Sequence, residues 1–211
     1  MKIVVTRAAA QADPVVERLE ALGHDVVRCP LIRIEPLADE PIDPSPYDWV
    51  VVTSPNGADE LARRLASPPR HLAAIGPATA EALRTHGLRV DLVPRVSTQE
   101  GLLAELPSGG RVLLAAAEGA RRLLVDERGA DFLALYRTVE LKPPAPVGDL
   151  VLLASPSAAR ALAATGAKLP VVAIGPQTAA EARAHGLDVA AVADAHSLEG
   201  LLDAVRSLER R

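Results

Sequence analysis

The chain has 211 residues, of which 49% are hydrophobic and only 2% aromatic, and its formal net charge is −4. This length suits two small domains, and a core of Val, Leu, Ile and Ala suits parallel strands covered by Ala-rich helices. The acidic balance gives no support for a surface that binds nucleic acid or an anionic membrane. The single cysteine, Cys29, lies in an apolar run, and we interpret it as a small core residue of a protein from a reducing compartment.

The N-terminal residues, from Met1 to Arg7, run directly into an apolar strand without the hydrophobic region of a signal peptide. No apolar stretch approaches the roughly 20 residues that span a bilayer. We therefore expect a cytoplasmic protein with no membrane partner. No long apolar stripe in the sequence indicates a surface for a second subunit, so a monomer is expected.

Short apolar runs alternate along the chain with amphipathic stretches of helical period. The strands are predicted at 3–6, 25–29, 49–53, 72–75, 90–93, 111–115, 131–135, 150–154, 171–174 and 189–192. The helices are predicted at 12–22, 56–65, 77–86, 98–106, 118–127, 156–164, 176–185 and 197–208. Strands separated by helices of this length predict an α/β protein with parallel sheets flanked by helices.

An internal repeat joins the two halves of the chain. Residues 74–80 (AIGPATA) recur at 173–179 (AIGPQTA), and 100–103 (EGLL) recur at 199–202. Upstream, Ser54-Pro55 matches Ser155-Pro156. A weaker match joins the turn at Gly23 to the turn at Gly129. The chain therefore carries two copies of a strand–turn–helix architecture, which predicts two similar lobes.

Two divisions into lobes fit this repeat. In a sequential division, the lobes are about 1–107 and 109–211. In an exchanged division, the first βαβ piece joins the last part of the chain, and residues 30–36 and 136–142 are extended crossings between the lobes. The pattern of apolar residues does not decide between them.

Four matching turns each follow a strand and open a helix. Each places a Ser or Gly at the expected N-cap and a Pro at the first helical position: Ser54-Pro55, Gly76-Pro77, Ser155-Pro156 and Gly175-Pro176. Free backbone N–H groups at a helix N-terminus bind anions, and turns at the carboxyl ends of parallel strands are where ligands bind. A lone turn of this kind is usually only a helix cap. The repeated set predicts one shared cleft for an anionic small molecule.

The usual signatures of cofactor and metal sites are missing. No GxGxxG follows a strand, no GxxxxGK[ST] is present, and the histidines and cysteine have no metal-ligand spacing. His86 and His185 each precede a glycine at the end of a predicted helix, which is typical of a C-cap. We therefore expect a site without a metal and without a cofactor.

Two side chains near the predicted strand ends are candidates for binding an anion or donating a proton. Arg7 follows the first strand, where it can act as a carboxylate clamp or as a solvated loop residue. Tyr136 lies at the start of the second crossing, where it can donate a proton or serve as a packed hinge residue. Arg121 and Arg122 are expected at the start of the helix 118–127, on a solvated face.

These motifs, in this order, resemble uroporphyrinogen-III synthases. The resemblance runs over essentially the whole chain and is most specific at the second Gly-Pro motif and the SLEGLL stretch from Ser197. It rests on Val4-Val5-Thr6-Arg7, Thr53-Ser54-Pro55-Asn56-Gly57, Ala74-Ile75-Gly76-Pro77-Ala78-Thr79, Leu135-Tyr136-Arg137-Thr138-Val139, Ser155-Pro156-Ser157-Ala158 and Ala173-Ile174-Gly175-Pro176-Gln177-Thr178-Ala179.

The resemblance implies two flavodoxin-like lobes with the exchanged topology, joined by a two-stranded linker. Lobe one is then 1–34 plus 142–211, lobe two is 36–135, and the linker strands are about 30–36 and 136–142. It also implies an enzyme of heme biosynthesis that needs no cofactor. That enzyme cyclises hydroxymethylbilane, a linear tetrapyrrole with eight carboxylates, to uroporphyrinogen III. Water is lost, and the terminal pyrrole is inverted through a spiro intermediate.

By this resemblance Tyr136 is the catalytic candidate, since it can assist loss of the hydroxyl group. The substrate-binding candidates are Arg7, Ser54, Asn56, Gly76, Thr79, Ser155, Ser157, Gly175 and Thr178. The family often has a basic residue where this chain reads AAAEG at 115–119, which weakens any substrate contact there. The alternative function is a non-enzymatic protein that binds a tetrapyrrole or another small anion on the same scaffold.

Overall fold

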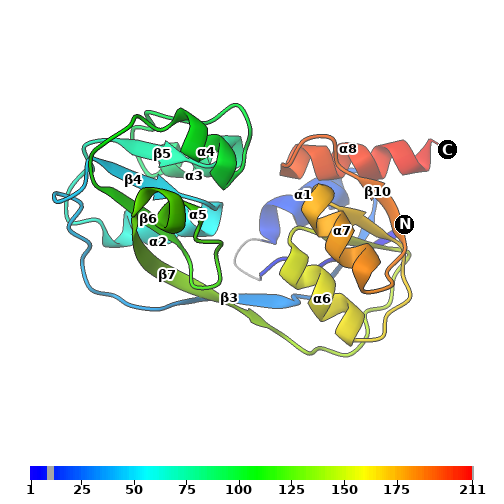
Figure 1. Cartoon of the computed structure of the whole chain (residues 1–211). Coiled ribbons are helices and arrows are strands. Elements are labelled where there is room, and N and C mark those ends of the chain that lie inside the picture. Colours follow the sequence, from blue (N-terminus) through cyan, green and yellow to red (C-terminus); the bar gives the residue numbers. More distant parts are fainter. Residues whose placement is uncertain (9–11, 211) are drawn as a thin grey trace. The chain divides into compact units, whose positions relative to one another are not determined.

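The computed structural model describes residues 1–8 and 12–210, which form a mixed α/β fold with parallel sheets flanked by helices, as predicted (Figure 1). Its residue contacts divide the chain into two compact units. Unit 1 comprises Met1–Arg33 and Thr138–Arg211, and unit 2 comprises Ile34–Arg137.

The sheet of unit 1 has the order β10-β9-β8-β1-β2, and every pairing in it is parallel. Its strands are β1 (Lys2–Val5), β2 (Asp25–Arg28), β8 (Leu150–Leu153), β9 (Val171–Ala173) and β10 (Val189–Val192). Its helices are α1 (Asp13–Ala21), α6 (Pro156–Ala164), α7 (Pro176–Ala184) and α8 (Leu198–Glu209).

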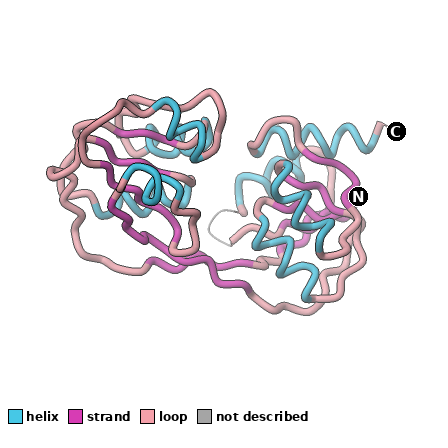
Figure 2. Tube along the Cα trace, viewed as in Figure 1, coloured by secondary structure: helices cyan, strands magenta, loops and turns pink. Residues whose placement is uncertain are grey.

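Alternation of apolar side chains along the central strands builds a core on both faces of this sheet. Ile3 and Val5 pack with α1 and α8 on one face, whereas Val4 packs with α6 and α7 on the other. Figure 2 shows the helices on both sides of the strands. Since both faces are covered, the strands read as continuous apolar runs, which explains why they were predictable.

The sheet of unit 2 has the order β3-β7-β6-β4-β5. Its strands are β3 (Ile32–Pro36), β4 (Trp49–Val52), β5 (Leu72–Ala74), β6 (Val112–Ala117) and β7 (Asp131–Glu140). Its helices are α2 (Pro55–Arg64), α3 (Pro77–Thr85), α4 (Gln99–Glu105) and α5 (Leu123–Arg128). Val50 and Val52 pack with α2 and α3, and Val51 packs with α4 and α5 on the opposite face.

The strands β3 and β7 both extend across the boundary between the units. They are neighbours in one sheet, and backbone hydrogen bonds join Leu37 N to Leu135 O and Leu141 N to Leu31 O. The order of these partners means that the two strands run antiparallel. The strand β7 is continuous, where the sequence suggested a strand at 131–135 followed by a separate crossing.

The predicted strand at 90–93 is wrong, because only an isolated parallel bridge joins Leu92 to Ala73 beside β5. The Asp91 carboxylate accepts the backbone N–H of Leu72 at 3.0 Å. A side-chain oxygen thus bonds to an N–H group of β5 beside this segment. Pro94, two residues after Leu92, has no N–H group to extend a ladder of backbone hydrogen bonds.

The helix predicted at 118–127 begins later, at Leu123, so Arg121 precedes it and Arg122 is its N-cap. The backbone N–H of Glu118 still bonds to the carbonyl of Tyr136 on β7, at 2.8 Å. The side chain of Gln99, which is 3% exposed, then donates to the Arg121 carbonyl at 2.6 Å. These two contacts hold residues 118–122 as a loop at the end of β6.

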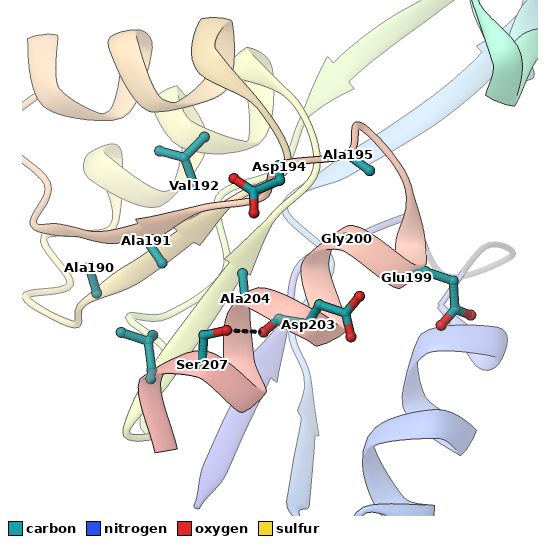
Figure 3. Close-up of a pocket in the computed structure, with 11 residues that line it drawn as sticks. Ala190, Ala191, Val192, Asp194, Ala195, Glu199, Gly200, Asp203, Ala204 and Ser207 are labelled. Atoms are coloured by element: carbon teal, nitrogen blue, oxygen red, sulfur yellow. Dashed lines mark hydrogen bonds between the residues drawn. The ribbon is translucent and has the colours of Figure 1, made fainter. Parts of the chain in front are cut away.

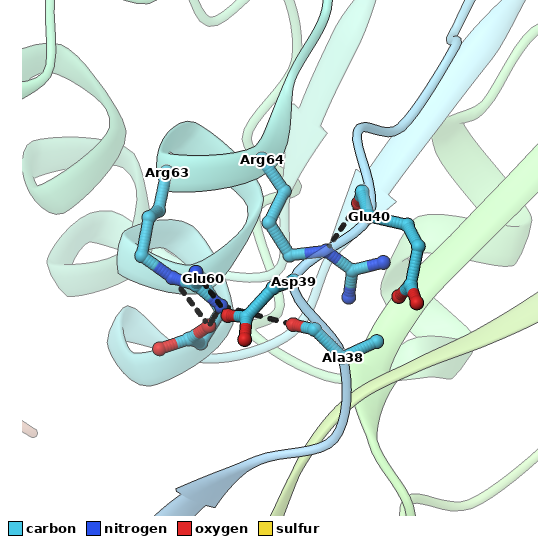
Figure 4. A network of polar contacts seen from close by, with 6 residues as sticks. All are labelled: Ala38, Asp39, Glu40, Glu60, Arg63 and Arg64. Atoms are coloured by element: carbon cyan, nitrogen blue, oxygen red, sulfur yellow. Dashed lines mark hydrogen bonds and ion pairs between the residues drawn. The ribbon is translucent and has the colours of Figure 1, made fainter.

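Two arginines anchor the C-terminal end of α2 (Figure 4). Arg64, only 7% exposed, donates its Nε–H to the Glu40 carbonyl at 2.9 Å, and Arg63 pairs with Asp39 at 2.7 Å and Glu60 at 2.8 Å. The segment that follows β3 is thereby tied to α2. The opposite end of α2 carries one of the predicted turns, so this anchor fixes the axis of a helix that reaches the candidate site.

Within the described ranges, no helix combines the length and the hydropathy that a membrane span requires.

Candidate functional site

The predicted site residues lie at the carboxyl ends of the parallel strands of their own sheets. In unit 2, the Ser54 turn follows β4, the Gly76 turn follows β5, and Tyr136 is on β7. In unit 1, Arg7 follows β1, the Ser155 turn follows β8, and the Gly175 turn follows β9. Because parallel strands end at one edge of a sheet, each unit gathers its candidates at a single edge.

The four predicted N-caps are confirmed. Ser54 and Ser155 have extended backbones, and the prolines that follow open α2 and α6. The Ser54 hydroxyl accepts the N–H of Gly57 at 3.0 Å, and the Ser155 hydroxyl accepts the N–H of Ala158 at 3.2 Å. Each serine thus satisfies one of the N–H groups that a helix start leaves free.

Tyr136 is buried, with 4% of its surface exposed, and its hydroxyl lies 2.8 Å from the Ser54 hydroxyl. Burial raises the pKa of the phenol, while side-chain hydrogen bonds with Ser54 and Asn56 act in the opposite direction. The phenol therefore stays protonated at neutral pH, and its hydroxyl is held at the N-terminus of α2. The structure brings together three of the predicted residues, namely Tyr136, Ser54 and Asn56.

The corresponding turn of unit 1 has a different partner. The Ser155 hydroxyl lies 3.0 Å from the hydroxyl of Ser157, two residues further along the chain. Both predicted residues therefore belong to one local turn. The pair offers hydroxyl groups to a ligand but no weak acid comparable to the phenol of unit 2.

The helices α3 and α7 begin at Gly76 and Gly175, and neither N-cap has a side chain to accept an N–H group. Their φ angles of −168° and −178° are ordinary extended values. The glycine at Gly76 leaves room instead, because a Cβ atom there would lie 2.7 Å from the Ser97 hydroxyl oxygen. These two helix ends keep their first N–H groups available to an anion.

Thr79 and Thr178 occupy the same place in the first turns of α3 and α7, with 3% and 2% of their surfaces exposed. Neither hydroxyl bonds to a residue that the structure describes. Across those residues, the fully buried polar side-chain atoms without a hydrogen-bond partner are His24 Nε2 and Arg64 NH1. The two threonine hydroxyls therefore keep access to solvent, and each can donate to a ligand at its helix end.

Arg7 is half-buried two residues after β1, and burial lowers the pKa of its guanidinium. The group nevertheless remains cationic at neutral pH. Its side chain has no ion pair with any carboxylate in the described part of the chain. A partly desolvated guanidinium of this kind is suited to an anionic ligand, which is the first of the two interpretations that the sequence left open.

Two further residues at these turns were missed at the sequence level, namely Ser97 and His196. Ser97 lies against Gly76, and the ring atoms of His196 lie 3.6–3.8 Å from where a Cβ of Gly175 would be. Each follows its glycine by the same distance in sequence and directly precedes the N-cap of the next helix. This shared spacing from the two glycines of the repeat is the sequence signal that could have identified them.

A cavity of about 390 Å³ lies between β10 and α8 of unit 1 (Figure 3). It contains none of the predicted site residues, and its walls carry Asp194, Glu199 and Asp203. Three carboxylates would repel a ligand that itself carries carboxylates. We therefore assign the candidate site to the turns and not to this cavity.

No group of three or more His, Cys, Asp or Glu residues that could hold a metal ion occurs in the described part of the chain. The donors at the turns are hydroxyls, backbone N–H groups and one guanidinium. Such groups bind carboxylates, and the phenol of Tyr136 adds a proton donor.

Comparison with known proteins places this geometry in a family. Residues 13–203 match the family model described as uroporphyrinogen-III synthase HemD. The chain is 29% identical over 136 residues to a uroporphyrinogen-III synthase from Synechococcus elongatus, an alignment that covers 57% of this chain and 52% of the relative. It is 30% identical over 169 residues to a putative uroporphyrinogen-III synthase from Methanothermobacter thermautotrophicus, covering 71% and 67%. The chain thus spans about half the length of the first of these relatives.

The fold is also found in a crystal structure of a mutant uroporphyrinogen III synthase from Thermus thermophilus. The TM-score is 0.65 at 20% sequence identity, and all of both chains is covered. The family model spans most of the chain and includes nearly all of the predicted site residues. This chain therefore belongs to the uroporphyrinogen-III synthase HemD family.

Proposed function

We propose that this protein is a uroporphyrinogen-III synthase, a cyclising lyase of tetrapyrrole biosynthesis. It takes hydroxymethylbilane, expels the terminal hydroxyl as water, closes the macrocycle and inverts the last pyrrole ring. The reaction uses no cofactor. Family membership and the residues at the strand ends support this proposal.

The observation that carries the proposal is the contact between Tyr136 and Ser54. A buried phenol lies 2.8 Å from the hydroxyl that caps α2, at the edge where the parallel strands of unit 2 end. This arrangement holds a weak acid beside a helix N-terminus, whose dipole favours negative charge. The site therefore offers both a proton and a place for the charge that remains.

Tyr136 is proposed to donate its proton to the leaving hydroxyl of the substrate as the carbon–oxygen bond breaks. Water departs with that proton, and the carbocationic terminal pyrrole is attacked by the substituted α-carbon of the pyrrole at the other end of the chain, which gives a spiro intermediate. The bond from that carbon to its original methylene bridge then breaks, and the released methylene cation bonds to the free α-carbon of the same pyrrole, which inverts the ring. When the final pyrrole regains aromaticity, it loses a ring proton, which restores the phenol. Ser54 and Asn56 hydrogen bond to the phenolate in the interval and limit the cost of its buried charge.

The other turns are proposed to bind the carboxylates of the substrate. The protein is acidic overall, so affinity for a polyanion must come from local donors. The helix N-termini at Gly76 and Gly175, the hydroxyls of Thr79 and Thr178, and the guanidinium of Arg7 are such donors. Fixing a flexible chain in a folded pose favours ring closure over escape of the reactive intermediate.

We further propose that the turns of both units bind the same substrate molecule, and that Ser155 and Ser157 take part. The units are proposed to act as two flavodoxin-like lobes joined by β3 and β7 as a two-stranded linker. The protein is proposed to work as a monomer in the cytoplasm, without nucleic acid or membrane. We expect one substrate molecule to bind per protein, with an affinity that falls on substitution in either unit.

An isomer assay tests the function. Freshly prepared hydroxymethylbilane is supplied to the protein, the products are oxidised, and uroporphyrins I and III are separated chromatographically. We expect isomer III in excess over the isomer I that forms spontaneously. Isomer I alone, from protein whose circular dichroism shows a folded chain, would contradict the synthase and favour a non-enzymatic tetrapyrrole-binding protein.

A further inference from the structure

The loop between β10 and α8 is held at both of its ends. At its start, the N–H of Ala193 donates to the Ala173 carbonyl at the end of β9, at 2.9 Å. At its end, Ser197 caps α8 by accepting the N–H of Gly200 at 3.1 Å. A Cβ on Gly200 would lie 2.0 Å from the Ala195 carbonyl oxygen, so the loop packs directly on the first turn of α8. These contacts fix where the next side chain, His196, can lie.

The fixed loop places the His196 imidazole beside the N-terminus of α7. Its Cδ2, Cγ and Nε2 atoms lie 3.6, 3.7 and 3.8 Å from the position that a Cβ of Gly175 would take. The ring keeps contact with solvent and has no hydrogen bond to any residue in the described ranges. Partial burial lowers the pKa of His196, so the ring is neutral at neutral pH and has one N–H to donate.

The N-terminus of α7 has a second feature that points to a ligand. Thr178 lies in the first turn of the helix and exposes only 2% of its surface. Its hydroxyl bonds to no described residue. Gly175 provides no capping side chain, so the N–H groups of this turn also lack a partner at the N-cap. Backbone, hydroxyl and imidazole donors therefore surround one helix end.

Resting on the proposed function, we propose that His196 is a specificity-determining residue that donates a hydrogen bond to one substrate carboxylate bound at the N-terminus of α7. The equivalent position in unit 2, Ser97, offers a shorter side chain at the N-terminus of α3. The two matching helix ends thus differ in reach. The α7 end accommodates a carboxylate further from the helix than the α3 end does.

The test uses the whole 211-residue chain in the isomer assay, with kcat and KM measured separately. We expect His196→Ala to raise KM for hydroxymethylbilane by about tenfold, as for a lost hydrogen bond to a charged group, with little change in kcat. His196→Gln restores a side-chain N–H and should recover most of the loss. Thermal unfolding of each variant checks that the fold is retained.

A matched variant tests the position and not only the side chain. Gly175→Ala places a methyl group at ordinary contact distance from the imidazole, on a backbone that any residue adopts. We expect a folded protein with a raised KM, because the methyl group fills the space between the ring and the helix end. An unchanged KM in both Ala variants overturns the inference, as does a KM raised equally in His196→Ala and His196→Gln. Wild-type protein that produces only isomer I instead contradicts the proposed function itself.

Discussion

The two units share one sheet order but differ in how the chain enters it. Unit 1 reads β10-β9-β8-β1-β2. Unit 2 reads Leu92-β5-β4-β6-β7 once the isolated bridge to Ala73 is included and the edge strand β3, beside β7, is set aside. In unit 2 these segments all come from one continuous stretch of chain. In unit 1, β1 and β2 come from the N-terminal part of the chain, far from the other three strands. The internal repeat therefore marks one architecture used twice, with a circular permutation in unit 1.

The side chains at the strand ends differ more than the scaffold does. The register of β6 and β1 against their neighbours makes Ala116 of unit 2 the counterpart of Arg7 in unit 1. Ser54 bonds to Tyr136, but its counterpart Ser155 bonds to Ser157. Backbone donors are thus common to both units, while the acid belongs to unit 2 and the cation to unit 1. Under the proposed function, unit 2 therefore supplies the proton donor, while both units bind carboxylates.

The largest effect is expected where the units are most alike. A Cβ on Gly101 would lie 2.1 Å from the Val96 carbonyl oxygen, and a Cβ on Gly200 would lie 2.0 Å from the Ala195 carbonyl oxygen. Gly101→Ala and Gly200→Ala should each lower the free energy of unfolding by about 2–4 kcal/mol, as for other strained substitutions. Urea denaturation followed by circular dichroism measures both.

Gly119→Ala is the matched control, since a Cβ there would meet nothing within 4 Å. Equal losses in the two clashing variants, with none in the control, would support equivalent loops. A loss in only one of them would show that the structural repeat does not extend to these turns.

The second largest effect is expected on kcat. Tyr136→Phe removes the phenol hydroxyl while keeping the packed ring, so we expect kcat to fall by about 100-fold with the fold retained. Tyr47→Phe is the control, because Tyr47 packs at the edge of the unit 2 core and its phenol contacts Asp131. An unchanged rate for Tyr136→Phe would remove Tyr136 from the mechanism.

The paired serines give a smaller and more specific test. Ser54→Ala and Ser155→Ala each remove an N-cap, which costs about 1 kcal/mol of stability. Only Ser54→Ala also removes a hydrogen bond to the phenol, so its kcat should fall about tenfold further than that of Ser155→Ala. Stopped assays and thermal unfolding of the same samples give both numbers, and equal kcat values would argue against the asymmetry.

The smallest effect is the ionisation of Tyr136. Burial raises the pKa of its phenol above the ordinary value of 10, and it also raises the pKa of Tyr47. In Tyr47→Phe, absorbance at about 295 nm should therefore stay low at pH 10 and rise only above it, whereas the protein unfolded in urea titrates near pH 10. The stabilisation that comes from this burial is present below pH 10 and is lost as pH rises through the raised pKa. A midpoint at or below 10 in the folded protein would mean that the phenol is not desolvated.

Sequence reasoning was most reliable where the signal is local. Strands buried on both faces are continuous apolar runs, and a Ser or Gly before a Pro marks a helix start whatever lies around it. The parallel α/β class, the four N-caps and the C-caps at His86 and His185 followed from these rules. The two misplaced elements, at 90–93 and 118–127, each involve a side-chain contact that the pattern does not show: Asp91 accepts the N–H of Leu72 on β5, and Gln99 donates to the Arg121 carbonyl.

Contacts between residues far apart in the chain needed the tertiary structure. The sequence identified Tyr136 and Ser54 separately, 82 residues apart, and only the sheet order β7-β6-β4 brings their hydroxyl oxygens to 2.8 Å from each other. Apolar periodicity alone also left open which strands share a sheet, because it specifies burial but not the neighbour that provides it. His196 went unnoticed for the same reason, since its closeness to Gly175 comes from a loop packed on another helix. Local propensity thus determined the elements and their caps, and long-range packing decided which side chains meet.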